Sequence, residues 1–369
     1  MNPASSISAT FQILMDFDST NAQEQVAGRK AMTVLNIAMV GSDDLAKSIA
    51  KASDQRDVHT YVHKEMGPDG ARILSIIRPA KLPDRIRPLF NALCAARVGL
   101  VEVKGIDANL GEVLVAYASA GIDKGIFIIN PDAGDWVDED QVKGLFVQAG
   151  LGEWINFGTD GIELRSALYA MMDEILSELE SAKEEPLVIP VDQHFNVKGI
   201  GLVAIGYVQS GTLKVHDDFL MMPADGPGVV KSLQVMDDDV NQAVAGDRVG
   251  IAMRNAKEDH LSGGSLVIHP AIEDKNKGIS IPLALDKHEK SKVELTQSPF
   301  QRRVLEVGDI VHASVDLQFS VGRIESIGAE MVIAWDTPIF IRKQNPPTVL
   351  LAQLDSKPRI MGSAKLNRL

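Results

Sequence analysis

The chain has 369 residues, enough for two or three domains that each bury a core. Hydrophobic residues make up 45% of it, but no apolar run approaches the roughly 20 residues that a membrane-spanning helix needs. A single cysteine excludes an intramolecular disulfide, which is typical of a reducing cytoplasm. We therefore expect a cytoplasmic globular protein without a membrane partner.

The formal net charge is −13, and the acidic excess lies in the first 270 residues. Residues 271–369 hold 14 lysines and arginines against 12 acidic residues. Nucleic-acid binding depends on a few well-placed cations, so this composition does not exclude an RNA partner.

Residues 1–31 carry neither the basic leader nor the apolar stretch of a signal peptide. They precede the first convincing strand pattern. We expect these residues to be a disordered extension or an added leader.

Residues 32–185 alternate between short apolar runs and helical patterns. The runs are rich in Val, Ile and Leu, and the expected helices lie between or after them, at 45–53, 82–96, 109–121 and 163–185. Strands that are apolar on both faces and alternate with helices predict an α/β domain with a parallel sheet covered on both sides. The runs are VLNIAMV (34–40), ARILSIIR (71–78), VGLVEV (98–103) and GIFIIN (125–130).

The pattern changes after Pro186. Short alternating strands broken by Gly and Asp predict an antiparallel β-barrel over 186–270, followed by a polar stretch near residues 269–277. A second set of strands predicts another barrel within 271–369. The expected fold is an α/β sheet domain followed by two antiparallel β-barrels.

The first strand is followed by GSDDLAKS (41–48), which is similar to a phosphate-binding loop. Gly41, Lys47 and Ser48 match that motif, whereas Ala46 replaces its second glycine. The alternative is an ordinary strand-to-helix junction with a solvated Lys47 and with Ser48 in the first helical turn. The motif alone does not decide between the two.

The second domain carries a more specific combination of residues. A phenylalanine, four spaced glycines and an acidic residue are followed by an Ala-Gly-Asp turn. These residues resemble domain 2 of the translational GTPases elongation factor Tu and elongation factor 1-alpha, and most of all the archaeal selenocysteine-specific elongation factor. They are Phe195, Gly199, Gly201, Gly206, Gly211, Asp217, Ala245, Gly246 and Asp247.

Residues 298–328 and the closing KPRIMG are similar to the third domain of that factor. The resemblance therefore covers about residues 32–369. It implies an elongation factor Tu-like three-domain architecture in which residues 32–185 are a G domain.

The resemblance also implies that this G domain is degenerate. Arg78 to Lys81 stand where the family has Asp-x-x-Gly, and Asn130 to Ala133 stand where it has the guanine-reading Asn-Lys-x-Asp. Only 29 residues separate Ser48 from Arg78, which leaves little room for a mobile first switch. We expect no nucleotide cofactor and no enzymatic activity. The expected degenerate site comprises Gly41, Ala46, Lys47, Ser48, Arg78, Lys81, Asn130 and Asp132.

The family's aminoacyl pocket maps onto Asp192, Gln193 and Arg248. Gln193 replaces an arginine of the selenocysteine-specific factor, so half of the cationic charge is lost and selenocysteine specificity is in doubt. A surface ion pair between Asp192 and Arg248 is the alternative.

The resemblance implies tRNA or another structured RNA as partner, with the ribosome as a second candidate. A GTP-binding elongation factor with an atypical site and a protein-interaction scaffold remain alternatives. His59 and His63 lack a third partner that would indicate a metal site. The expected RNA contacts are Lys198, Arg302, Arg303, Arg323 and Lys343, together with Arg248.

Overall fold

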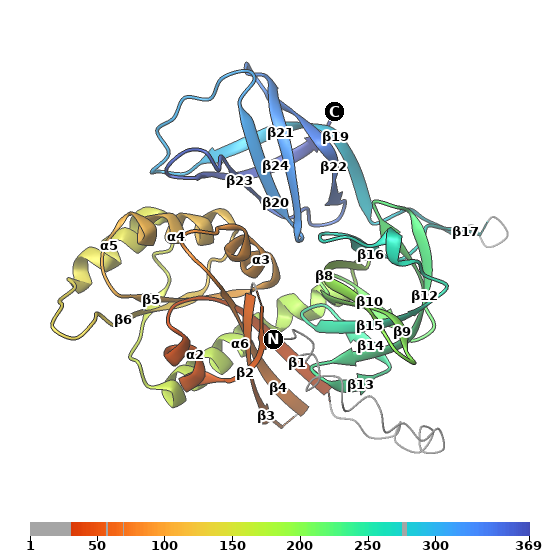
Figure 1. The fold of residues 1–369 in the computed structure, drawn as a ribbon, viewed down its shortest axis with the longest axis horizontal. Coiled ribbons are helices and arrows are strands. Elements are labelled where there is room, and N and C mark those ends of the chain that lie inside the picture. The colour runs from red at the N-terminus through yellow and green to blue at the C-terminus, as the bar shows by residue number, and fades with distance from the viewer. Residues whose placement is uncertain (1–30, 57, 69, 275–278) are drawn as a thin grey trace, which may run out of the picture.

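The computed structural model describes residues 31–369 except 57, 69 and 275–278. Apart from Ala31, the predicted leader lies outside the described residues. An α/β domain is followed by two β-barrels, and the three bodies lie against one another (Figure 1). The fold class expected from the sequence is confirmed. The domain limits 32–185, 186–270 and 271–369 stay predictions, with which the element bounds below agree.

The first domain is built on a seven-stranded sheet of order β2-β3-β4-β1-β5-β6-β7. Strands β4, β1, β5, β6 and β7 run parallel, whereas β2 and β3 pair antiparallel at one edge. The elements are β1 Ala31–Val40, α2 Asp43–Ile49, β2 Lys51–Gln55, β3 Val58–Met66, β4 Gly70–Pro79, α3 Arg87–Ala95, β5 Val98–Val103, α4 Ala108–Ser119, β6 Gly125–Ile129, α5 Glu139–Ala149, β7 Ile155–Asn156 and α6 Gly161–Lys183.

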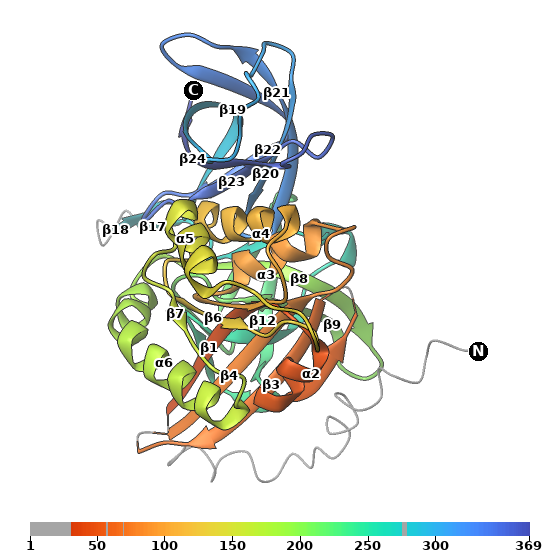
Figure 2. The same ribbon diagram turned by 90° about the vertical axis from the view of Figure 1, so that its left-hand side faces the viewer.

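Two hydrophobic clusters cover the two faces of this sheet. Helices α2 and α6 pack on one face, and α3, α4 and α5 pack on the other. Figure 2 shows the second group of helices between the sheet and the third domain. The helix predicted at 45–53 ends at Ile49, because Ala50 is extended and Lys51 pairs with Val62 of β3. Helix α5 was not predicted, although its sequence EDQVKGLFVQA carries an apolar stripe that buries Val142, Phe146 and Ala149.

A tryptophan packs onto two glycines of neighbouring strands. Gly99 of β5 is directly opposite Gly125 of β6. The buried Trp154 ring lies over both, and a Cβ at Gly125 would come within 2.5 Å of the indole. Because both glycines lack a side chain, the indole ring can pack directly on the two strands.

We expect Gly125→Ala to lower the free energy of unfolding by about 1–3 kcal/mol, because the added methyl overpacks the Trp154 site. Gly144→Ala is the matched control, since its Cβ meets nothing within 4 Å on α5 and Ala stabilises a helix interior by about 0.5–1 kcal/mol. Chemical denaturation measures both variants. Equal effects of the two substitutions would contradict this packing.

The second domain is a ring of six strands, β11-β16-β8-β9-β15-β12, closed by the pairing of β11 with β12. The third domain is a closed barrel of order β19-β22-β21-β20-β23-β24. Strand β17 lies in the polar stretch predicted near 269–277, and its partner β18 lies just beyond that stretch. The elements are β8 Val188–Val197, β9 Gly201–Tyr207, β10 Thr212–Lys214, β11 Asp218–Met222, β12 Gly226–Val235, β13 Asp238–Val240, β14 Gln242–Val244, β15 Arg248–Arg254, η4 Glu258–His260, β16 Leu266–Ile268, β17 Ile272–Asp274, β18 Ile279–Ile281, β19 Leu285–Gln297, β20 Ile310–Val315, β21 Gln318–Ser326, β22 Met331–Arg342, β23 Val349–Ala352 and β24 Ile360–Arg368.

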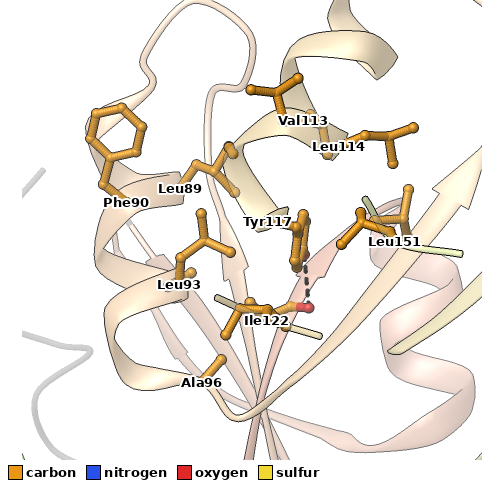
Figure 3. Close-up of a cluster of buried hydrophobic side chains, with 14 of the residues drawn as sticks. Leu89, Phe90, Leu93, Ala96, Val113, Leu114, Tyr117, Ile122 and Leu151 are labelled. Carbon is orange, nitrogen blue, oxygen red and sulfur yellow. Dashed lines mark hydrogen bonds between the residues drawn. The ribbon is translucent and has the colours of Figure 1, made fainter. Parts of the chain in front are cut away.

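The first and third domains share one hydrophobic core. Side chains of α3 and α4, including Leu93 and Tyr117 (Figure 3), belong to the same cluster as Leu350 and Ile360 of the third domain. Beside this cluster, Arg359 donates through Nε to both carboxylate oxygens of Glu112, at 3.0 and 3.1 Å. The two domains are therefore joined by buried apolar contact and by a largely buried ion pair.

The first and second domains are joined by polar contacts and by shared apolar packing. Asn36 Nδ2 donates to the Gly246 carbonyl at 2.8 Å, and Lys64 forms an ion pair with Asp238. Val34 and Ile73 of the first sheet lie in the hydrophobic cluster of the second domain. Each barrel thus packs against the α/β domain through its own interface.

Candidate functional site

The junction after β1 is shorter than a phosphate-binding loop. Strand β1 ends at Val40 and α2 begins at Asp43, so only Gly41 and Ser42 lie between them. Ser42 is the N-cap, and its Oγ accepts a hydrogen bond from the Leu45 amide at 3.2 Å. The capping serine and two aspartates in the first turn start the helix early.

This early start places three predicted site residues inside the helix. Ala46, which replaces the second glycine of the motif, is fully buried in the core beneath α2 and does not face a phosphate position. Lys47 and Ser48 lie in the last turn of α2, where the alternative interpretation had put Ser48 in the first turn. Ser48 Oγ donates to the Leu45 carbonyl at 2.8 Å.

Lys47 is neutralised by its own helix. Its Nζ forms an ion pair with Asp43 Oδ2 at 2.5 Å, and 56% of its side chain is exposed. Asp43 also accepts a hydrogen bond from the Tyr61 hydroxyl. The hydrogen bonds from Lys47 and Tyr61 hold the pKa of Asp43 below its ordinary value. Lys47 is exposed, as in the alternative interpretation, but it is also paired with Asp43.

A buried carboxylate faces this junction. Glu102 lies on β5, is 7% exposed, and accepts a hydrogen bond from the Ser42 amide through Oε2 at 2.5 Å. Its Oε1 accepts from Asn130 Nδ2 at 2.6 Å. A Cβ at Gly41 would come within 2.9 Å of the Glu102 Cβ, so this glycine permits the close approach. Sequence reasoning missed Glu102, although it is the one charged residue in the apolar run VGLVEV.

The remaining predicted nucleotide-site residues have partners within the chain. Arg78 Nε donates to the Gly41 carbonyl at 2.6 Å, on the other side of the junction from Glu102. Asp132 forms an ion pair with Lys104 at 2.7 Å. Lys81 is exposed in a left-handed conformation with φ of 61°. Gly41 and Asn130 lie against Glu102, and Arg78 contacts Gly41 from the opposite side, while Lys81 and Asp132 are not among these contacts.

The predicted aminoacyl residues form a second polar cluster between the first two domains. Arg248 NH2 lies 3.9 Å from Asp192 Oδ2, with 18% and 22% of the side chains exposed. This pair is largely buried, which corrects the surface-pair alternative. Burial raises the pKa of Asp192. Arg248 Nε and Gln193 Oε1 are buried without hydrogen-bond partners, so this cluster has unused donor and acceptor capacity.

The predicted RNA contacts divide into separate groups. Arg303 pairs with Asp309 at 3.0 Å, and Arg323 NH1 donates to the adjacent Gly308 carbonyl at 2.7 Å. Arg302 and Arg303 lie in the loop between β19 and β20, and Arg323 contacts Gly308 of the same loop. All three arginines are exposed.

Lys343 directly follows the last residue of β22. Arg323 pairs with Ala334 of that strand, nine residues earlier, so Lys343 lies toward the other end of the barrel. It lies 3.7 Å from Asp286. Lys198 is exposed on the second domain, and Arg248 is too buried for direct contact with RNA in this conformation.

Comparison with known proteins places this fold. The sequence profile of elongation factor Tu domain 2 matches residues 201–268. Elongation factor 1-alpha of Saccharolobus solfataricus is 33% identical over 102 residues, which cover 27% of this chain and 23% of that factor. A bacterial selenocysteine-specific elongation factor, EF-Sec, has a TM-score of 0.70 and 20% identity, over 92% of this chain and 58% of that one. The second domain is thus similar to domain 2 of elongation factor Tu, and the whole chain has the three-domain fold of the selenocysteine-specific elongation factors.

One relative matches this chain along most of its length. An uncharacterized protein of Methanocaldococcus jannaschii is 26% identical over 343 residues, covering 91% of this chain and 100% of that protein. By contrast, the chain spans about half of EF-Sec and about a quarter of elongation factor 1-alpha. The likeness to EF-Sec concerns the fold.

The Ala-Gly-Asp turn of this elongation factor-like chain buries a carboxyl group. Asp247 is 6% exposed, and its Oδ2 accepts a hydrogen bond from the Val244 amide at 2.8 Å. Burial raises the pKa of Asp247 from 3.8 to about 7. Because the folded state holds the proton more tightly, ionisation of Asp247 opposes folding.

We therefore expect the wild type to lose stability relative to Asp247→Asn as the pH rises from about 4 to about 7, by at most about 4 kcal/mol. The asparagine keeps an acceptor for the Val244 amide. Urea unfolding of both proteins across this pH range measures the difference. A stability difference that does not change with pH would contradict the raised pKa.

The two histidines that could suggest a metal have separate partners. His63 Nδ1 lies 2.9 Å from the Tyr169 hydroxyl, and His59 Nδ1 lies 3.4 Å from Arg78 NH1. Within residues 31–369, without the six that are not described, no three His, Cys, Asp or Glu residues gather as metal ligands.

Among the helices of the described residues, none is both long and apolar enough to cross a membrane.

Proposed function

We propose that this chain is a non-enzymatic, cytoplasmic elongation factor-like protein that binds tRNA or another structured RNA without a guanine-nucleotide cycle. The observation that carries the proposal is the hydrogen bond from the Ser42 amide to Glu102. In a phosphate-binding loop, amides at this place would meet the nucleotide's phosphates.

A nucleotide phosphate would have to displace the Glu102 carboxylate. Displacement would deprive the Glu102 carboxylate of its two hydrogen-bond donors, the Ser42 amide and the Asn130 side chain, although Glu102 is only 7% exposed. Burying an unpaired charge is costly. Asp43 and Asp44 add negative charge at the start of α2, which further disfavours an anion there.

Two further groups that phosphoryl transfer requires are paired or replaced in this chain. The lysine that would contact phosphate is paired with Asp43, and the position of the metal-holding aspartate is Arg78. The guanidinium of Arg78 donates to the Gly41 carbonyl. These contacts support a first domain that serves as a scaffold.

The RNA-binding part of the proposal rests on the similarity to elongation factors and on exposed cations. Arg302, Arg303 and Arg323 around one loop offer guanidinium groups that can pair with phosphates. The cluster of Asp192, Gln193 and Arg248 is the proposed site for an aminoacyl end. Since Arg248 is close to Asp192, we infer that this site does not select an anionic side chain.

A titration with fluorescent GTP and Mg²⁺ tests the nucleotide part of the proposal. We expect no saturable binding, with elongation factor 1-alpha of Saccharolobus solfataricus as the positive control. Micromolar affinity would favour a GTP-binding elongation factor with an atypical site. Purification with a protein partner, together with no affinity for RNA, would favour an interaction scaffold.

A further inference from the structure

A cavity of about 380 Å³ lies where all three domains meet. The first domain contributes Arg97 and Glu178, the second contributes Gln209, and the third contributes Arg342. Buried apolar side chains, Phe90 among them, also line it. Its volume is within the range of small-molecule sites. It is separate from the Glu102 junction and from the Arg248 cluster, since none of the residues of those clusters lines it.

The arginine on its inner wall is only partly satisfied. One amino group of Arg97 donates to the Gln209 carbonyl at 3.1 Å and lies 3.4 Å from its Oε1. In the described part of the chain, no carboxylate lies within 4.0 Å of the Arg97 guanidinium, whereas Arg342 is paired with Asp316 at 3.1 Å. Burial, with Arg342 nearby, lowers the pKa of Arg97. The guanidinium can therefore gain from an added anionic group.

The outer part of the cavity has the opposite charge. Glu178 of α6 lines it and is exposed, as are Asn345 and Thr348 of the third domain, so these three mark its mouth. The half-buried Glu185 also lines it and accepts a hydrogen bond from Asn345. With Arg342 and Asp316 neutralising each other, one arginine and two glutamates remain. A purely anionic ligand would be repelled by these glutamates.

We propose that this cavity binds a small zwitterion of the amino-acid class, with its carboxylate at Arg97 and its ammonium toward Glu178. Such a ligand satisfies the inner guanidinium and the outer carboxylates together. Because the cavity walls come from three domains, a bound ligand also ties the domains together and stabilises the folded chain.

Thermal unfolding of the full chain with each free amino acid at millimolar concentration tests this proposal. At least one amino acid is expected to raise Tm by several degrees. Its N-acetyl derivative lacks the ammonium and its amide lacks the carboxylate, so neither should do so. The proposal is overturned if no amino acid raises Tm, or if either blocked derivative raises it equally.

Two variants locate the effect. Arg97→Gln is expected to abolish the ligand-induced rise in Tm, and Glu178→Gln is expected to reduce it. Glu178 is exposed at the mouth, so its replacement leaves the core intact. Glu163→Gln removes the same charge from the exposed start of α6, away from the cavity, and should leave the rise unchanged. An undiminished rise in Glu178→Gln would show binding elsewhere or in another mode.

Discussion

Glu112→Ala is expected to lower the free energy of unfolding by about 3–5 kcal/mol, because it leaves the Arg359 charge largely buried without its partner. The exposed fractions of the Arg359 and Glu112 side chains are only 14% and 12%. The Arg359 backbone amide also donates to Glu112, at 2.9 Å. Burial alone would raise the pKa of Glu112, but the hydrogen bonds from Arg359 hold this pKa below its ordinary value.

Calorimetry and urea unfolding measure this loss. The double variant Glu112→Leu, Arg359→Met serves as the control, since replacing both charges by apolar side chains of similar size should recover most of the stability. A loss of about 1 kcal/mol or less in the single variant would place the pair among surface ion pairs and contradict its role between the domains.

Replacing Arg302, Arg303 and Arg323 by glutamine is expected to weaken RNA binding by about tenfold to a hundredfold at moderate salt, because phosphate contacts are lost. Each lost contact should also reduce the slope of log affinity against log salt concentration by about 1. The three side chains surround one loop, so they can face the same stretch of RNA backbone. Filter binding of total tRNA at several salt concentrations measures both effects.

The control for this triple variant removes the same charge from the first domain. Lys104, Lys124 and Lys143 are partly exposed and paired with acidic residues of that domain. Their replacement by glutamine should leave RNA affinity nearly unchanged. If the two triple variants weaken binding equally, net charge rather than the loop of the third barrel governs the affinity.

The architecture could be predicted because its patterns are local. Continuous apolar runs indicate the parallel strands, and alternation broken by Gly and Asp indicates the barrels. The antiparallel pairing of β2 with β3 was missed because LAKSIAKAS has a helical pattern up to its end, whereas its last residues join a sheet edge. Tertiary pairing decided the conformation of that segment.

The nucleotide region was predicted less well, because its geometry depends on competition between motifs. Ser42 followed by two aspartates is itself an N-cap signal, and this signal determined where the helix begins. The place of Glu102 depends on β1 and β5 being neighbours and on Asn130 at the end of β6. Such contacts between strand ends are absent from any single motif. The three-domain cavity is equally beyond sequence patterns.

We propose that this elongation factor-like chain binds RNA without responding to guanine nucleotide. Filter binding of tRNA, measured with and without GTP and Mg²⁺, tests it most directly. The predicted result is one and the same affinity in both conditions, falling as salt is added. An affinity that GTP changes by about tenfold, which corresponds to about 1.4 kcal/mol of coupling, would contradict the claim, as would no binding at low salt.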